Sequence, residues 1–170
     1  MIENQENLLF VDEAVYSSTQ IAQKVWAPRG LESPMVARNK ISFKAVAVVA
    51  AMDIRGKVVA VHMKEKSIKK ADFLDFLSLL RESVKDRQIL LLDNLSFHRS
   101  KEVKEYCADN EFTIEYNSIY SSQVNAIERL WSFSKREFRR ECIRTKNFKN
   151  KALIRRLVSE SIYGVPESPL

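Results

Sequence analysis

The feature that most constrains the fold is a series of short apolar runs that alternate with amphipathic segments. Two of these runs, at 41–52 and 88–92, are apolar on both faces, as are strands whose sheet is covered by helices on both sides. A helical pattern and another apolar run at 112–116 follow the second of them. Strands separated by helices pair in parallel through right-handed crossovers. The sequence therefore predicts an α/β domain with helices packed on its sheet.

Periodicity and turn residues predict the other elements. A strand is expected over 7–15, and turn residues at 53–56 indicate that 57–63 returns as an antiparallel hairpin partner. A further short strand is expected at 24–30. Amphipathic patterns predict helices over four ranges: 70–83, 100–110, 125 to about 140, and 147–163.

Length and hydropathy exclude a membrane protein. A chain of 170 residues is long enough to bury a core of its own. Its longest apolar run, 45–52, is too short for a bilayer span, which needs about 20 residues. The N-terminus has neither a basic segment nor a long apolar segment of the kind that directs secretion. We therefore expect a cytoplasmic protein with no membrane partner.

Positive charge is concentrated in one segment. Residues 129–156 hold eleven Lys and Arg and only two acids, whereas the whole chain carries +6. A local cationic block on a near-neutral body is typical of a surface that binds a polyanion such as nucleic acid. The alternative is a solvated helix surface that serves solubility.

Asp12 stands in a strand that is apolar on both faces up to Val11. An ionised carboxylate in a buried strand is costly unless it is paired or bound to a metal. The alternative is that the strand ends at Val11 and that both Asp12 and Glu13 are exposed. Because neighbouring side chains of a strand alternate, Glu13 is expected to point away from the site of Asp12.

Two further acids occur later in the chain. Asp93 follows the apolar run 88–92, at the carboxyl end of a strand, where α/β sheets bind ligands. Asp93 and Asn94 also form a common turn sequence, because both side chains can bond nearby backbone. Glu128 lies in the first turn of a predicted helix, and its spacing from Asn125 also fits an N-terminal capping box. Taken singly, these acids are explained at least as well by structural roles.

Together the three acids predict a metal site. Mg²⁺ prefers oxygen ligands and keeps several waters, so two or three carboxylates suffice to bind it. Two such ions about 3.5–4 Å apart activate a water or a 3′-hydroxyl and stabilise the leaving oxygen of a phosphodiester. Clustered carboxylates repel one another, which is an independent reason to expect a cation. We therefore predict that Asp12, Asp93 and Glu128 converge around one cleft.

The helix that carries Glu128 also offers groups that could bind phosphates. A hydroxyl and two cations lie four, seven and eleven residues after Glu128, on the same helix face. The alternative is again a solvated polar face. The candidate DNA-binding residues are Ser132, Lys135, Arg136, Arg139 and Arg140.

His98 follows Asp93 by five residues and could approach the metal site. A lone histidine is more often a structural hydrogen-bonding residue, and that interpretation is favoured here. Asn94, His98 and Asn125 are the candidates for side chains that support the acids.

Four segments together resemble the catalytic domain of mariner-type DDE transposases, in the bacterial insertion-sequence branch. The matching segments are Phe10–Glu13, Trp26–Gly30, Leu91–Asn94 with His98, and Asn125–Trp131. The gap of 34 residues between the second Asp and the Glu is the spacing used in one large branch of that superfamily.

The resemblance implies an RNase H-like fold, with a mixed five-stranded sheet flanked by helices, over 1–145, followed by a basic helix and tail at 146–170. It implies that Asp12, Asp93 and Glu128 bind two Mg²⁺ or Mn²⁺ ions. The implied activity is nicking of double-stranded DNA at element ends, followed by attack of the freed 3′-hydroxyl on target DNA. The implied partners are transposon and target DNA, an upstream helix-turn-helix module in cis or in trans, and a second copy of the chain on DNA.

The chain departs from the family pattern in two places. The loop before the Glu is proline-rich in the family, whereas 118–126 contains no proline, which removes backbone constraint near the site. The first catalytic strand also starts close to Met1. Two alternatives therefore stay open: an inactive remnant that only binds DNA, and another RNase H-like nuclease such as a ribonuclease H or a junction resolvase.

Overall fold

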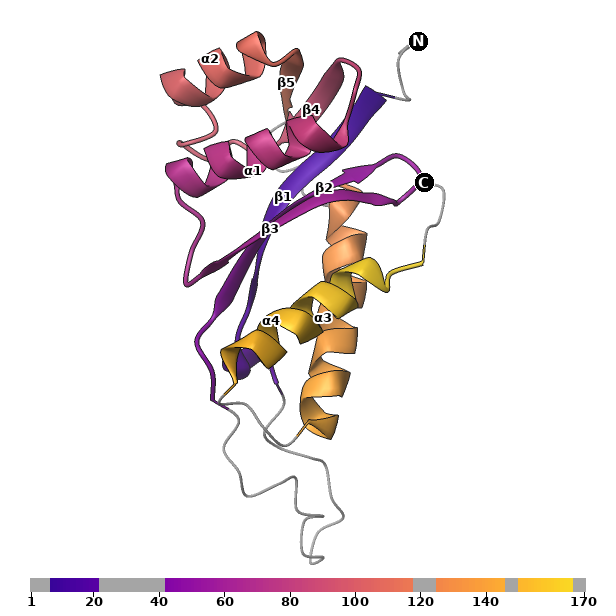
Figure 1. Ribbon diagram of the computed structural model, residues 1–170. Coiled ribbons are helices and arrows are strands. Elements are labelled where there is room, and N and C mark those ends of the chain that lie inside the picture. Colours follow the sequence, from indigo (N-terminus) through magenta and orange to yellow (C-terminus); the bar gives the residue numbers. More distant parts are fainter. Residues whose placement is uncertain (1–6, 22–41, 118–124, 146–149, 167–170) are drawn as a thin grey trace, which may run out of the picture.

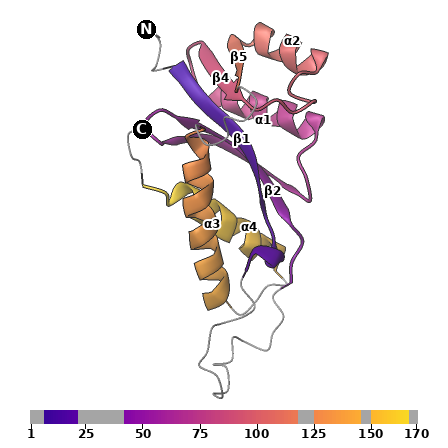
Figure 2. The same cartoon turned by 180° about the vertical axis from the view of Figure 1, so that it is seen from behind.

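The computed structural model describes residues 7–21, 42–117, 125–145 and 150–166 (Figure 1). The strand expected at 24–30 lies outside the described residues, as does most of the proline-free loop. Within the described part the chain forms one sheet with helices on both of its faces, as Figures 1 and 2 show from opposite sides.

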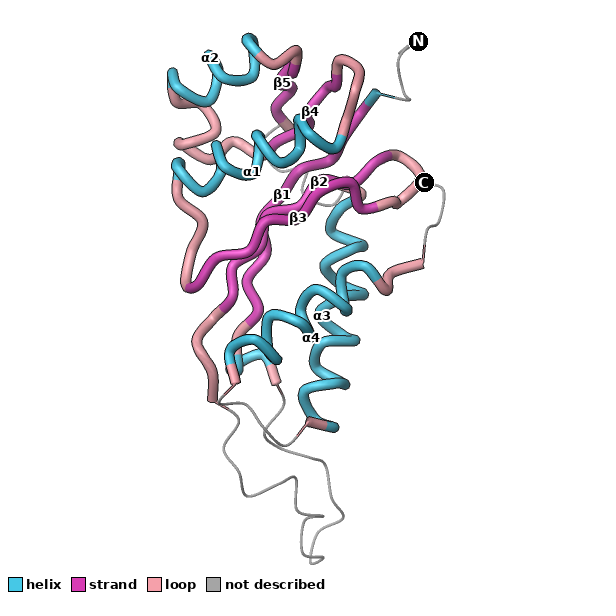
Figure 3. Tube along the Cα trace, viewed as in Figure 1, coloured by secondary structure: helices cyan, strands magenta, loops and turns pink. Residues whose placement is uncertain are grey.

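The sheet has five strands in the order β3-β2-β1-β4-β5 (Figure 3). β1 pairs antiparallel with β2 and parallel with β4, and β4 pairs parallel with β5. The predicted mixed five-stranded sheet of an RNase H-like fold is therefore confirmed. The strand bounds are β1 Leu8–Tyr16, β2 Val46–Asp53, β3 Val58–Glu65, β4 Gln88–Leu92 and β5 Phe112–Tyr116.

The start of β2 differs from the expectation. The apolar run begins at Ile41, but β2 begins at Val46, because Val46 pairs with the last residues of both neighbouring strands, Tyr16 of β1 and Glu65 of β3. Among the described residues, 42–45 have no strand beside them that would extend the ladder, and the backbone bond from the Lys66 N–H to the Ala45 carbonyl marks its end.

The hairpin between β2 and β3 forms as predicted. The Asp53 carboxylate accepts hydrogen bonds from the backbone N–H groups of Arg55 and Lys57, both at 2.9 Å. Gly56 has a φ of 83°, which a residue with a side chain adopts only at a cost. These two features fix the turn, and the turn fixes the register of the hairpin.

The predicted helices are also present, α1 with the bounds expected and the other three with shifted ends. α1 and α2 cover one face of the sheet, and α3 and α4 cover the other (Figures 1 and 2). None of the described helices is long and apolar enough to cross a membrane. The helix bounds are α1 Lys70–Ser83, α2 Lys101–Asp109, α3 Ile127–Arg144 and α4 Lys151–Tyr163, with a short 3₁₀ helix at Ser18–Gln20.

Two apolar cores lie on opposite faces of the sheet, and β1 contributes to both. Phe10, Ala14 and Tyr16 face α3 and α4, whereas Leu9 and Val11 face α1 and α2. This alternation places Asp12 on the α3 side of β1 and Glu13 on the α1 side.

Two contacts with Tyr16 of β1, one between hydroxyl groups and one between aromatic rings, hold α3 on the sheet. The Tyr16 hydroxyl lies 2.6 Å from Ser134 Oγ, and the Phe138 ring packs edge-on against Tyr16 with 5.2 Å between ring centroids. α4 packs against α3, and its own apolar residues join the same core. The amphipathic pattern that predicted α3 has its apolar face in the core, where five of its residues are buried: Ile127, Leu130, Trp131, Ser134 and Phe138.

The unequal lengths of β1 and β4 leave space beside the second half of β1 for the side chains of a site. β4 pairs with only the first three residues of β1, Leu8 to Phe10, while β1 continues beside β2 as far as Tyr16. In the described part of the chain, the second half of β1 therefore has no strand on its β4 side. The turn that follows Leu92 occupies this position and carries Asp93 and His98.

Candidate active site

Asp12 lies within β1, half-buried, on the face that α3 covers. The indole Nε1 of Trp131 donates a hydrogen bond of 3.1 Å to Asp12 Oδ2. Burial raises the pKa of the Asp12 carboxyl to about 6, and the negative charges of Glu13 and Glu128 add to the increase, against the hydrogen bonds from Trp131 and the Glu13 backbone. Asp12 is thus a carboxylate that a nearby cation would stabilise.

The raised pKa of Asp12 makes the stability of the metal-free protein depend on pH. The folded state holds this proton up to about pH 6, whereas the unfolded chain releases it near the ordinary value of 3.8. Ionisation of Asp12 therefore costs folding free energy as the pH rises from about 4 to about 6, and the cost remains above that range. We expect Asp12→Asn, which cannot ionise, to be more stable than the wild type by about 2–3 kcal/mol at pH 8 and by little at pH 4.

Thermal melts in a chelator at both pH values measure this difference. Asp109→Asn, which changes an exposed carboxylate on α2, is the control and should match the wild type at both pH values. Equal melting temperatures of Asp12→Asn and the wild type at pH 8 would contradict the expected cost.

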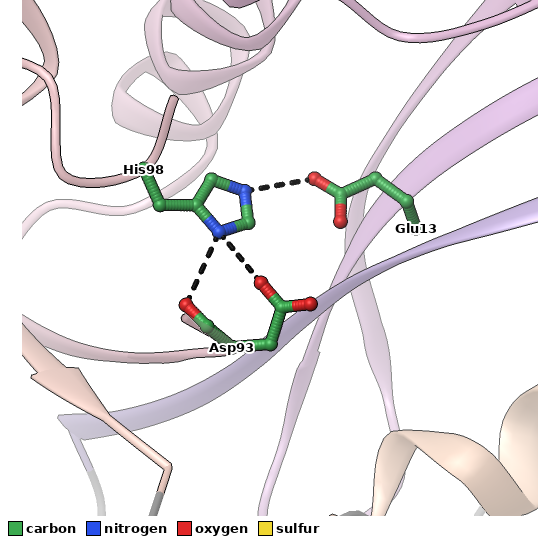
Figure 4. Close-up of side chains that lie close together, drawn as sticks. All are labelled: Glu13, Asp93 and His98. Carbon is green, nitrogen blue, oxygen red and sulfur yellow. Dashed lines mark hydrogen bonds and ion pairs between the residues drawn. The ribbon is translucent and has the colours of Figure 1, made fainter. Parts of the chain in front are cut away.

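Asp93 directly follows β4, and one of its carboxylate oxygens is held by two donors. Oδ1 accepts a hydrogen bond of 3.1 Å from the Leu95 backbone N–H and lies 2.9 Å from His98 Nδ1. The side chain is still 43% exposed. Oδ2 receives no hydrogen bond or ion pair from any residue that the structure describes, and Figure 4 shows it directed away from His98. Asp93 thus combines a fixed orientation with one free oxygen.

His98 is fully buried. Two aromatic rings pack against it, and it lies between the carboxylates of Glu13 and Asp93 (Figure 4). Its ring centroid lies 4.5 Å from that of Phe73 and 4.3 Å from that of Phe97. Nε2 lies 3.0 Å from Glu13 Oε1. Burial opposes the charged imidazole, but the hydrogen bond and charge of Glu13, together with the charge of Asp93, outweigh it and raise the pKa of His98 above its usual value.

The expectation that Glu13 points away from Asp12 is correct for its strand face, but Glu13 contacts His98, which also contacts Asp93. Glu13 leaves β1 on the face opposite Asp12, and there its Oε1 lies 3.0 Å from Nε2 of His98, the residue whose Nδ1 lies 2.9 Å from Asp93 Oδ1. Ligand atoms of Glu13, Asp93 and His98 all lie within 4.8 Å of one another. Glu13 Oε2 is buried without a hydrogen-bond partner among the residues that the structure describes. The structure therefore groups Asp93 with Glu13, and it places Asp12 beside Trp131 and within reach of the charge of Glu128.

A second group whose ligand atoms lie within 4.8 Å of one another is on the α1 side of the sheet and consists of His62, Asp72 and Asp75. Asp72 already pairs with Lys64 at 2.6 Å and accepts the Lys69 backbone N–H at 3.0 Å. These contacts explain Asp72 without a metal, because its carboxylate caps the start of α1 and is neutralised by a lysine. Within the described ranges no such group contains Asp12 or Glu128.

Glu128 is exposed in the first turn of α3. The capping-box alternative is not realised, because the helix is capped at Ala126 without a side-chain bond and no described residue bonds the Glu128 carboxylate. Asn125 is buried, and its Oδ1 accepts the Ile127 backbone N–H at 3.4 Å. Asn94 donates to the Asn117 carbonyl at 2.7 Å, so it joins the ends of β4 and β5 and does not contact an acid.

The candidate DNA-binding residues of α3 separate into two groups. Arg136 and Arg140 both pair with Glu137, so their charge is partly neutralised. Lys135 and Arg139 form no ion pair with any described residue, and Arg139 Nε donates to the Lys135 carbonyl at 3.0 Å. With exposed Ser132 they follow Glu128 along one side of the helix. The side of α3 that begins at Glu128 therefore carries two cations with no acidic partner among the described residues, Lys135 and Arg139.

Two of the contacts at this site could not be read from the sequence as it stands. Trp131 fits the apolar stripe of α3, and nothing in the spacing shows that its indole N–H reaches Asp12 across 119 positions. Glu13 lies next to Asp12, but strand alternation alone argues against its taking part. An acid pair on a strand, with a histidine after the neighbouring strand, is the signal that would have indicated the contact.

An RNase H-like sheet with acids on β1, after β4 and at the start of α3 defines a class of nucleic-acid-processing enzymes. The chain belongs to the DDE superfamily endonuclease family, whose family model matches residues 7–150. The resemblance to mariner-type transposases of the insertion-sequence branch is thereby confirmed at the level of the family.

Relatives agree with this membership. The chain is 34% identical over 79 residues to the insertion element IS630 uncharacterized 39 kDa protein of Shigella sonnei, a match that covers 45% of this chain and 22% of that protein. The fold is similar to that of the Mos1 strand transfer complex, with a TM-score of 0.71, 15% identity, and coverage of 96% of this chain and 49% of Mos1. It is also similar to the catalytic domain of Mos1 mariner transposase, with a TM-score of 0.65, 12% identity, and coverage of 98% and 74%. The chain thus spans about half the length of the Mos1 chain in the strand transfer complex.

Proposed function

We propose that this chain is the catalytic domain of a transposase that cleaves DNA strands and joins them to target DNA with the help of divalent metal ions. The observation that carries the proposal is the placement of Asp12 on β1 and of Asp93 directly after β4, the parallel neighbour of β1. The last pair that links β1 to β4 is Phe10 with Leu91, and each of the two acids stands two residues after its member of that pair. Glu128, on the helix that packs over Asp12, lies close enough for its charge to act on the Asp12 carboxyl.

The donor groups fit a hard divalent cation. Asp93 offers a free and accessible Oδ2, and Asp12 offers a carboxylate whose ionisation is opposed by burial. An all-oxygen donor set with few protein ligands suits Mg²⁺ or Mn²⁺, which retain several waters. The catalytic domain of Mos1 has been solved with Mg and with Mn. We propose that Asp12, Asp93 and Glu128 hold two such ions.

The proposed chemistry needs no protein nucleophile. In the first step a water oxygen attacks a backbone phosphorus and the P–O3′ bond breaks, which leaves a free 3′-hydroxyl. In the second step this hydroxyl attacks a target phosphorus, and the target strand's own 3′-oxygen leaves. Bound divalent ions supply activation of the attacking oxygen and stabilisation of the leaving oxygen. The chain itself orients Asp93 through Leu95 and His98 and holds Asp12 against Trp131.

The substrate is proposed to be double-stranded DNA at element ends and in the target, bound through phosphates along α3. Mos1 has been solved in a paired-end complex with the left transposon end. Phosphate contacts position a protein but carry no sequence information. We therefore assign recognition of element ends to a helix-turn-helix module in cis or in trans, and pairing of the ends to a homodimer.

Binding of DNA by the isolated chain is expected to weaken steeply with salt, with a log–log slope of about −0.9 per phosphate neutralised. Replacing both Lys135 and Arg139 with Gln should make that slope shallower by about 2, because these cations have no acidic partner among the described residues. The matched control is the double replacement of Arg140 and Arg144, which pair with Glu137 and Glu141. Fluorescence anisotropy at several salt concentrations measures both slopes. A larger effect of the control pair would place the DNA elsewhere on the helix.

Nicking of a supercoiled plasmid in Mg²⁺ or Mn²⁺ tests the proposed activity. Parallel assays on RNA–DNA hybrids and on four-way junctions distinguish a transposase from another RNase H-like nuclease. DNA binding without nicking in either metal would indicate an inactive remnant.

A further inference from the structure

We propose that Glu13 and His98 form a positioning pair that fixes the Asp93 carboxylate, so that Oδ1 is held by the protein and Oδ2 is presented to a divalent cation. The inference rests on the proposed role of Asp93 as a metal ligand, and it adds two residues that hold that ligand in place. Neither Glu13 nor His98 is itself proposed to contact the cation.

The two oxygens of Asp93 are treated differently by their surroundings. Oδ1 receives the Leu95 N–H at 3.1 Å and lies 2.9 Å from His98 Nδ1. Oδ2 has no bonding partner among the described residues, and it points away from the ring in Figure 4. Two donors on one oxygen leave a carboxylate little rotational freedom. The free oxygen therefore has a fixed direction before any cation arrives, which favours binding.

The His98 ring can hold Asp93 only if its own orientation is fixed. Nδ1 lies 3.3 Å from the Asp93 carbonyl oxygen, which has no proton to donate, so Nδ1 carries a hydrogen. The Phe73 and Phe97 rings enclose the imidazole, and the Tyr116 hydroxyl donates to the His98 carbonyl at 3.1 Å. These contacts leave Nε2 as the ring atom that still needs a partner.

Glu13 supplies that partner from the neighbouring strand. Its Oε1 lies 3.0 Å from Nε2, and its side chain is only 15% exposed. Its other oxygen is buried and receives no hydrogen bond from a described residue, so burial of the Glu13 carboxylate costs free energy. A carboxylate that orients a histidine, which in turn orients a ligand group, is an arrangement that tunes metal sites in proteins. The chain Glu13–His98–Asp93 links β1 to the turn after β4 in this way.

Two substitutions of His98 separate the contacts of its two nitrogens. In His98→Asn the side-chain amide nitrogen takes the place of Nδ1, so the Asp93 contact is kept and the Glu13 contact is lost. In His98→Gln the amide nitrogen takes the place of Nε2, so the Glu13 contact is kept and the Asp93 contact is lost. The readouts are the Kd for Mn²⁺ alone, from calorimetry or electron paramagnetic resonance, and the rate of plasmid nicking.

We expect His98→Gln to weaken Mn²⁺ binding by about 10–100-fold and His98→Asn to weaken it several-fold less. His62→Gln, which changes the other histidine of the chain, should leave the Kd unchanged. Equal effects of the two His98 variants, whether both large or both absent, would overturn the positioning role, because a merely structural histidine would not distinguish its two nitrogens.

A pair of substitutions at Glu13 tests the same series of contacts from its β1 end. These variants also provide the test if the His98 variants fail to fold. Glu13→Gln keeps an oxygen that accepts the Nε2 hydrogen, and Glu13→Leu does not. We expect Mn²⁺ affinity close to that of the wild type in Glu13→Gln and a loss of about 10-fold in Glu13→Leu. Equal affinity in both variants would overturn the inference.

The proposed function and the positioning role fail in different ways. If the wild-type chain neither binds Mn²⁺ nor nicks DNA, the proposed function is wrong, and the positioning role falls with it. If the wild type does both and the His98 and Glu13 pairs show no discrimination, only the positioning role is wrong.

Discussion

Asp93→Asn is expected to abolish metal-dependent nicking while the protein remains folded. The amide keeps the shape of the side chain, and its oxygen still accepts from Leu95 and His98, so the turn after β4 should survive. The substitution does remove the negative charge that would hold a cation. Metal assistance contributes several kcal/mol to such reactions, so the nicking rate should fall by roughly a thousandfold or more.

The same loss is expected for Asp12→Asn and Glu128→Gln, since each is proposed to hold the same ions. Initial rates of plasmid nicking in Mg²⁺ and in Mn²⁺ measure the effect, and circular dichroism checks the fold. Asp109→Asn removes an exposed carboxylate of α2 and should keep the wild-type rate. A nicking rate within tenfold of the wild type in Asp93→Asn would remove Asp93 from the proposed metal site.

Phe138→Ala is expected to destabilise the protein by about 3–5 kcal/mol, which is typical of a fully buried aromatic residue. Phe138 is 0% exposed, and its ring packs edge-on against Tyr16 and Phe43, with ring centroids 5.2 and 5.9 Å away. These contacts hold α3 on the sheet, and α3 carries Glu128. The change should therefore lower nicking as well, through the position of α3.

Urea unfolding measures the loss of stability. Ile143→Ala lies on the same helix at a side chain that is 58% exposed, and it should change the stability by no more than about 0.5 kcal/mol. A loss below about 1 kcal/mol in Phe138→Ala would show that α3 is held mainly by other contacts.

The sheet and the helices could be predicted because local patterns determine them. The run that follows Gln88, at 89–92, is apolar throughout and forms β4 within the bounds expected, and the amphipathic pattern of α1 predicted that helix from Lys70 to Ser83. The start of β2 could not be predicted, because it depends on where β1 and β3 end. Ladder partners far apart in sequence, and not the apolar run itself, set that boundary.

The candidate site was predictable in its acids but not in the contacts of those acids. The position of Asp93 at the end of a strand is a local property. The contact of His98 with Glu13 joins residues 85 positions apart and depends on β4 stopping short of β1. Strand alternation gave the correct face for Glu13, yet it could not show that a turn from the neighbouring strand crosses to that face. The unequal environments of Asp12 and Asp93, one desolvated and one beside a buried histidine, likewise appear only in three dimensions.

A crystal of the chain soaked in Mn²⁺, measured at the manganese absorption edge, tests the central claim most directly. We predict anomalous density at the carboxylates of Asp12 and Asp93, with Asp93 Oδ2 as a ligand and His98 still bonded to Oδ1. Soaked crystals of Asp93→Asn should lose that density. Manganese bound only at His62, Asp72 and Asp75, or no density at Asp12 and Asp93 at saturating Mn²⁺, would contradict the proposed metal site.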